Sequence, residues 1–81
     1  MTLTVKKDDV PENIIRNALA AVRQQYKAID PQVMEQPSPI FTREDQWVLT
    51  VVDISAQKPP PGSNKFVVTM DRIGNILKID V

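Results

Sequence analysis

The C-terminal stretch of this 81-residue chain decides its fold, and it reads Lys65-Phe66-Val67-Val68-Thr69-Met70-Asp71-Arg72-Ile73-Gly74-Asn75-Ile76-Leu77-Lys78-Ile79-Asp80-Val81. Apolar side chains recur at every second position between Lys65 and Asp71, which predicts a half-buried strand. The residues from Asp71 to Asn75 are typical of a tight turn, in which Gly74 or Asn75 takes a positive φ. A second strand follows, so the stretch predicts a β-hairpin.

The same alternation predicts which side chains of the hairpin face the core. On the first strand these are Phe66, Val68 and Met70. On the second strand, from Ile76 to Val81, Leu77, Ile79 and Val81 are expected inward and Lys78 and Asp80 outward. The hairpin therefore offers one apolar face for another element to cover.

The segment from Gln46 to Ser55 is rich in β-branched residues and predicts a central strand that is apolar on both faces. One face carries Trp47, Leu49 and Val51, and the other carries Val48, Val52 and Ile54. Either loops such as 33–41 cover this second face, or it is a surface for a homodimer or another partner. The run Lys58-Pro59-Pro60-Pro61-Gly62-Ser63-Asn64 predicts an exposed loop after this strand.

An amphipathic helix is expected upstream of these strands. Asp9 and Glu12 flank Pro11 in the pattern of a capping box, which places the helix start near Val10. Its apolar stripe consists of Ile15, Ala18, Leu19, Val22, Tyr26 and Ile29. Because the residue before a proline is disfavoured in a helix, the Asp30-Pro31 pair ends it.

The remaining segments predict short strands and a long connection. Leu3 and Val5 alternate with polar residues, which is the pattern of a short strand over residues 2–6 and is equally compatible with a frayed terminus. The connection from Asp30 to Asp45 contains several prolines, and a short strand is possible at Pro39 to Thr42. The expected order is (β)-α-β-β-β in a single α+β domain, 1–81: one amphipathic helix packed on a three- to four-stranded antiparallel sheet.

The amino-acid composition disfavours several classes of function. The chain carries ten Lys and Arg and ten Asp and Glu, and it contains no His and no Cys. Balanced charge disfavours nucleic acid as a partner. Without His or Cys, the residues for Ser-His-Asp or Cys-His catalysis and for an ordinary zinc site are missing, so we expect no enzyme, metal or cofactor. No apolar run reaches the roughly 20 residues of a membrane span, and we expect a cytoplasmic protein that does not bind membranes.

Two groups of charged residues are candidate sites. Arg16, Arg23 and Lys27 form a basic strip on the predicted helix, which is either a solvated face or part of a partner-binding surface. Asp53, Asp71 and Asp80 lie on or beside strands, where a carboxylate pair would serve acid–base chemistry or hold a cation. Their spacing favours structural roles instead: Asp71 and Asp80 as polar-face or turn residues, and Asp53 as a strand-end charge that discourages edge pairing.

The chain resembles a PepSY-type module. The likeness lies in Trp47 with the alternating apolar residues after it, and in Phe66-Val67-Val68-Thr69-Met70-Asp71-x-x-Gly74-x-Ile76-Leu77-x-Ile79. Such modules are similar in order, with an Ala-rich helix before an antiparallel sheet that ends in a hairpin; Ile73 stands where the family usually has Thr. The resemblance implies a non-catalytic domain that binds or inhibits a partner such as a peptidase, and it implies no catalytic residues.

The sequence thus predicts a small protein-interaction module, monomeric or homodimeric. The expected partner-binding residues are Val48, Val52, Ile54, Arg16, Arg23 and Lys27. The alternative is a carrier of a small molecule or peptide, bound between the sheet and the 30–45 connection. That alternative is motivated by the apolar residues of the connection, Val33, Met34, Ile40 and Phe41.

Overall fold

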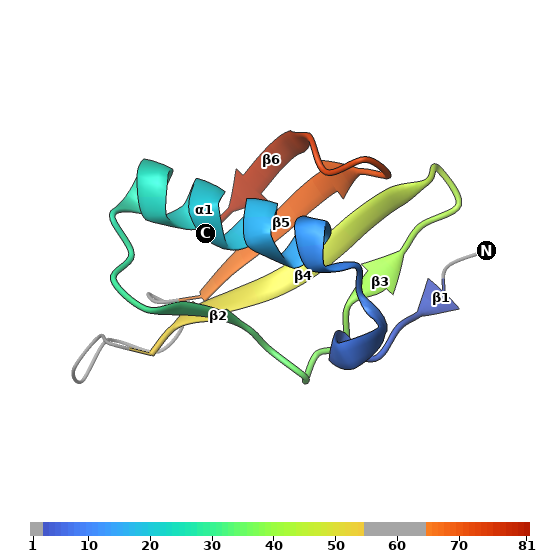
Figure 1. Ribbon diagram of the computed structural model, residues 1–81, viewed down its shortest axis with the longest axis horizontal. Coiled ribbons are helices and arrows are strands. Elements are labelled where there is room, and N and C mark those ends of the chain that lie inside the picture. The colour runs from blue at the N-terminus through green and yellow to red at the C-terminus, as the bar shows by residue number, and fades with distance from the viewer. Residues whose placement is uncertain (1–2, 55–64) are drawn as a thin grey trace.

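The computed structural model describes residues 3–54 and 65–81. In these residues the chain forms β1 (Leu3–Thr4), a 3-10 helix η1 (Lys7–Asp9), α1 (Glu12–Tyr26), β2 (Pro31–Val33), β3 (Ile40–Phe41), β4 (Gln46–Asp53), β5 (Lys65–Asp71) and β6 (Ile76–Asp80). The α+β class is confirmed: α1 crosses one face of an antiparallel sheet (Figure 1). The loop expected at Lys58 to Asn64 lies outside the described residues.

The described strands form one six-stranded sheet in the order β1-β3-β4-β5-β6, with β2 also paired to β4. The two halves of β4 have different neighbours on the same edge, because Ile40 of β3 opposes Val48 whereas Val33 of β2 opposes Val51. The sheet has six strands instead of three to four, because β2 and β3 both lie in the 30–45 connection, which was not part of the expected order. Pro31 begins β2, a position that proline tolerates in a strand.

The N-terminal strand pairs within the chain. Leu3 of β1 opposes Phe41 of β3, and the Val5 N–H donates to the Pro39 carbonyl at 2.8 Å. Of the alternatives left open at 2–6 and 39–42, the structure has short strands in both segments, and β1 and β3 span two residues each.

The helix is shorter than predicted at both ends. Asp9 belongs to η1, Val10 is extended, and Pro11 occupies the N-cap without a side-chain hydrogen bond, so the predicted capping box is wrong. At the other end Lys27 takes a left-handed conformation with φ of 55°, which stops the helix before Asp30-Pro31. Ile29 consequently leaves the apolar stripe and is 79% exposed.

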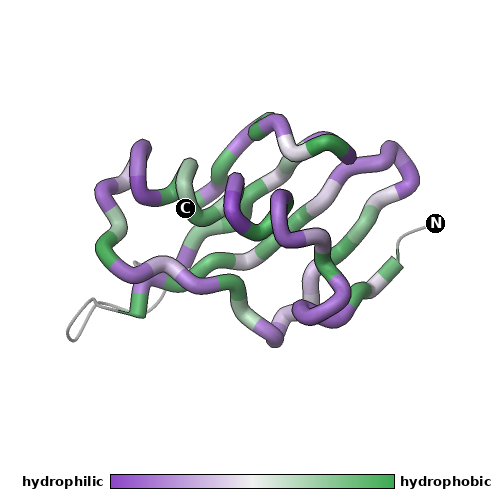
Figure 2. Tube along the Cα trace, in the orientation of Figure 1, coloured by the Kyte–Doolittle hydropathy of each residue, from purple (hydrophilic) through white to green (hydrophobic). Residues whose placement is uncertain are grey.

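The core lies between α1 and the facing side of β4 and β5. Its fully buried apolar side chains are Ile14, Ala18, Val22, Leu49, Val51, Val68 and Met70. Ile14 was missing from the predicted stripe, while Ile15 and Leu19 pack only at its margin. Hydrophilic and hydrophobic residues alternate along α1 in Figure 2, because each turn of the helix has one side towards solvent and one side towards this core.

The β5–β6 hairpin is present, but its second strand differs from the prediction. Gly74 takes the expected positive φ, at 104°. Met70 opposes Ile76 and Thr69 opposes Lys78, so Leu77 is the extra residue of a β-bulge. The inward positions are therefore held by Ile76 and Ile79, whereas Leu77 is 51% exposed and Val81 73% exposed.

Candidate interaction surface

The sheet has a second face that α1 does not touch, and β4 supplies its centre. Trp47, Leu49 and Val51 point towards α1 and are buried, while Val48 and Val52 point the other way and are half-buried. We use the term open face for this second side, formed by Ile40, Val48, Thr50, Val52, Val67 and Thr69. Of the described elements, the only α-helix packs on the opposite side of the sheet.

The 33–41 connection was one predicted cover for this face. Val33 opposes Val51 and is 3% exposed, and Phe41 opposes Trp47 with ring centroids 4.8 Å apart. Both side chains therefore lie on the helix side of the sheet. Val33 and Phe41 therefore add to the core, Ile40 adds to the open face, and Met34 is half-buried outside the core.

Polar side chains border the open face. Lys65 opposes Val52 on β5, and on β6 Lys78 opposes Thr69 while Asp80 opposes Val67. The Lys78 ammonium lies 3.6 Å from an Asp80 carboxylate oxygen, and both side chains are well exposed. An apolar centre with a charged rim is the usual anatomy of a protein–protein contact.

The structure separates the predicted site residues into two groups. Val48 and Val52 lie on the open face, and Ile54, 54% exposed, follows at the end of β4.

The basic residues of the predicted site are exposed on α1, where Arg16 makes an ion pair of 3.0 Å with Glu12. Arg16, Arg23 and Lys27 lie on the outer side of α1, away from the sheet that its buried residues contact. One flat partner surface therefore does not reach both groups.

Asp53 has a structural role that the sequence did not indicate. Its carboxylate accepts hydrogen bonds from the backbone N–H groups of Ile29, at 3.3 Å, and Asp30, at 3.2 Å. Pro31 pairs with Asp53 in the ladder, so the residue ties the helix exit to β4 rather than deterring strand pairing.

Asp71 organises the hairpin turn. Its carboxylate accepts from the backbone N–H of Asn75 at 2.9 Å, the Asn75 side chain at 2.9 Å and the Ile73 N–H at 3.0 Å. These donors, led by the Asn75 backbone, lower the pKa of the carboxyl from its ordinary 3.8 and outweigh the opposing effect of desolvation. Asn17 of α1 donates to the Gly74 carbonyl at 3.1 Å, which fastens the turn to the helix.

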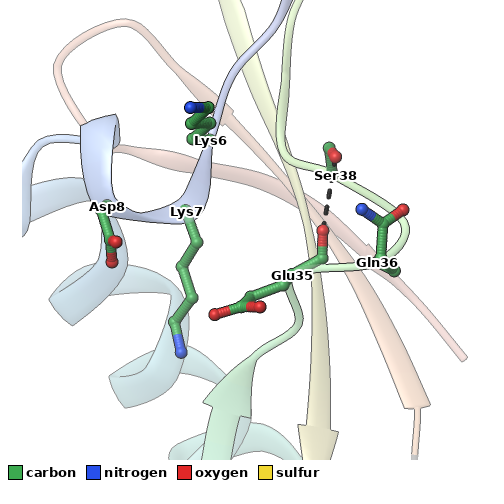
Figure 3. Close-up of a pocket in the computed structure, with 6 residues that line it drawn as sticks. All are labelled: Lys6, Lys7, Asp8, Glu35, Gln36 and Ser38. Carbon is green, nitrogen blue, oxygen red and sulfur yellow. Dashed lines mark hydrogen bonds between the residues drawn. The ribbon is translucent and has the colours of Figure 1, made fainter.

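A shallow depression of about 220 Å³ lies beside η1 and is lined by Lys6, Lys7, Asp8, Glu35, Gln36 and Ser38. Figure 3 shows the Lys7 and Glu35 side chains directed towards one another, and the Ser38 hydroxyl donates to the Glu35 carbonyl at 3.3 Å. The lining is polar, so this depression suits a small polar ligand better than an apolar one.

The described residues, 3–54 and 65–81, contain neither a candidate metal cluster nor a helix able to span a membrane. Within these ranges no group of three or more acidic, His or Cys side chains is placed to hold a metal ion. No helix in the same ranges combines the length and apolar character needed to cross a bilayer.

In the part of the chain that the structure describes, the fold belongs to the α+β class, and α1 covers one side of the sheet. No family model, curated protein or solved structure gives a significant match to the chain.

Proposed function

We propose that this protein is a small non-catalytic interaction module that binds a protein partner through the open face and the loops beside it. The observation that carries the proposal is the second apolar face of β4. Val48 and Val52 keep part of their surface in contact with solvent, although apolar side chains gain free energy from full burial. A partner that covers them would remove this apolar surface from water.

The surroundings of these valines support a protein as the partner. Ile40 and Val67 extend the apolar surface onto both neighbouring strands, and the half-buried Thr50 provides a hydroxyl group within it, whereas Thr69 is buried. Lys65, Lys78 and Asp80 form the charged rim, where they would set orientation and association rate more than affinity. The basic side of α1, with Arg23 and Lys27, is a separate surface for a second contact.

The likeness to PepSY-type modules extends this proposal to the class of partner. A helix precedes an antiparallel sheet, and the sheet closes with a hairpin built on Asp71 and Gly74. This order supports a peptidase as a partner that the module binds or inhibits. The proposal involves no catalytic step, cofactor, nucleic acid or membrane, and the absence of Cys from the sequence supports a cytoplasmic location.

The test is affinity capture of the tagged protein from source lysate, with light-scattering mass measured on the same preparation. Val52→Lys places a charge on the open face, and Gln24→Lys places the same charge on the exposed side of α1 as a matched control. The proposal predicts a defined captured protein that Val52→Lys loses and Gln24→Lys retains. A protein that captures nothing, or loses its partner equally with both variants, would contradict it.

The carrier alternative is favoured by one observation, namely that the described pocket lies at the 30–45 connection. Glu35, Gln36 and Ser38 of this connection form one side of it. Amide chemical shifts of these residues, followed during titration with a library of small polar fragments, would test the alternative. Selective shifts at the three residues would support a carrier, and the absence of any response to a chemically diverse library would contradict the carrier alternative.

A further inference from the structure

The outer edge of β6 points to self-association that is independent of the open face. β6 ends the strand order β1-β3-β4-β5-β6, so among the described residues only β5 pairs with it. One side of its backbone consequently presents N–H and C=O groups that another strand can satisfy. From Lys78 onwards the pairing with β5 is regular, because the bulge at Leu77 precedes it.

The side chains of this edge suit a second copy of the same strand. Lys78 and Asp80 are two residues apart, project from the same face and are well exposed. Leu77 and Val81 are exposed apolar residues at the two ends of the segment. An antiparallel copy would bring each charge opposite its counter-charge.

Two-fold symmetry restricts the register. In an antiparallel pair, residues that oppose one another lie on the same face of the sheet, so a two-fold axis must pass through a residue that faces itself. An axis at Lys78 opposes two ammonium groups, and an axis at Asp80 opposes two carboxylates. An axis at Ile79 pairs Lys78 with Asp80 of the second copy, in both directions.

We propose that the protein forms a two-fold symmetric homodimer in which β6 pairs antiparallel with β6 of a second copy about Ile79. The two sheets become one continuous sheet, and α1 of each copy lies on the same side of it. Two reciprocal Lys78–Asp80 contacts select this register over its neighbours, because opposed like charges are unfavourable across a ladder. The open faces remain side by side and free for the partner proposed above.

Charge reversal and charge exchange test the pairing. The dimer dissociation constant is measured by sedimentation equilibrium for the wild type, Lys78→Glu, Asp80→Lys and the double variant that combines both changes. Each single reversal opposes like charges and should weaken the dimer by about tenfold or more. The double variant restores opposite charges in the same register and should return to within about threefold of the wild type.

The exchange also restores the ion pair between residues 78 and 80 within one chain, so recovery of the dimer is read together with the folded state of each single variant. Circular dichroism of each variant provides a direct check, and the affected side chains are exposed. A monomeric wild type, or a dimer that is unaffected by both reversals, would overturn the proposal. A dimer lost in Val52→Lys and retained in Lys78→Glu would place self-association on the open face and would also overturn it.

A cysteine cross-link provides a second test of the register. The chain contains no Cys, so a single introduced thiol can form a disulfide only with the same thiol of a second copy. Ile79→Cys places the two thiols opposite one another across the axis and should form a disulfide dimer within the reversible dimer. Ile73→Cys, in the exposed turn, is the control for random collision. Equal rates of cross-linking for the two variants would overturn the register.

Discussion

The two faces of the sheet use similar residues and reach different degrees of burial. Val51 and Val52 are adjacent in β4 and have the same side chain, yet Val51 is fully buried under α1 whereas Val52 is only half-buried. Val68 and Val67 repeat this contrast on β5. The difference shows that an apolar strand residue becomes core only where another element packs on it. The side on which no helix of residues 3–54 and 65–81 packs is therefore the candidate surface for a partner.

The largest expected effect comes from truncating these paired valines. Val51→Ala leaves a cavity in the core and should lower the free energy of unfolding by about 2–3 kcal/mol. Val52→Ala removes the same atoms from a half-buried site and should cost less than about 1 kcal/mol. Urea unfolding of both variants, together with Val68→Ala and Val67→Ala, measures the contrast on two strands. Equal losses within each pair would mean that the open face is as well packed as the helix side.

A smaller loss of stability is expected at the contact between α1 and the turn of the β5–β6 hairpin. Gly74 has φ of 104°, and a Cβ added there would lie 2.5 Å from the Asn17 amide nitrogen. Gly74→Ala should therefore lower the free energy of unfolding by about 2 kcal/mol, partly from backbone strain and partly from this clash.

Asn17→Ala separates the two causes of that loss. In the Asn17→Ala background, Gly74→Ala no longer meets the amide and should cost less than in the wild type, with the backbone strain remaining. A thermal or urea double-mutant cycle measures the difference. An identical cost in both backgrounds would exclude a contribution from the contact.

Asp53 links the helix exit to β4 and has a moderate expected effect. Asp53→Ala removes the acceptor for the Ile29 and Asp30 N–H groups and should lower the free energy of unfolding by about 1 kcal/mol. Hydrogen exchange should then increase at these two amides and remain slow at the amides of β5. Unchanged protection at Ile29 and Asp30 would contradict the assigned role.

The smallest effect concerns Asp71 and depends on pH. Because the folded state lowers the pKa of Asp71, its stabilising contribution is complete above the ordinary value of 3.8 and is lost as the pH falls through the lowered folded value. The wild type and Asp71→Asn should thus differ most near neutral pH and converge in acid. Chemical unfolding between neutral pH and the acid range measures this, and Asn75→Ala, which removes a side-chain donor, should reduce the same pH dependence. A difference that grows in acid would contradict the assignment.

Much of this architecture follows from local patterns in the sequence. The hairpin, its glycine turn, the central strand and the amphipathic helix were all predicted from residue order. The helix boundaries were missed because Pro11 and Lys27 set them through backbone conformation rather than through a side-chain cap. β2 was missed because a three-residue strand that starts with proline carries too little alternation to detect.

Only part of the candidate surface was predicted from the sequence. The apolar character of Val48 and Val52 is visible in the sequence, since it depends only on alternation along one strand. The basic residues Arg16, Arg23 and Lys27 were grouped with them, although they lie on the far side of the helix. Their separation depends on which face of the sheet the helix covers, and this is a contact between distant segments.

The sequence by itself determined the class of fold, the amphipathic helix and the two-sided apolar strand, because each depends on the periodicity of neighbouring residues. Only the tertiary structure decided that α1 covers the Leu49 side of the sheet, that a bulge at Leu77 turns Ile76 inward, and that β6 lies at the edge. These features arise from packing and strand pairing between residues far apart in the chain, where local periodicity carries no information about the partner.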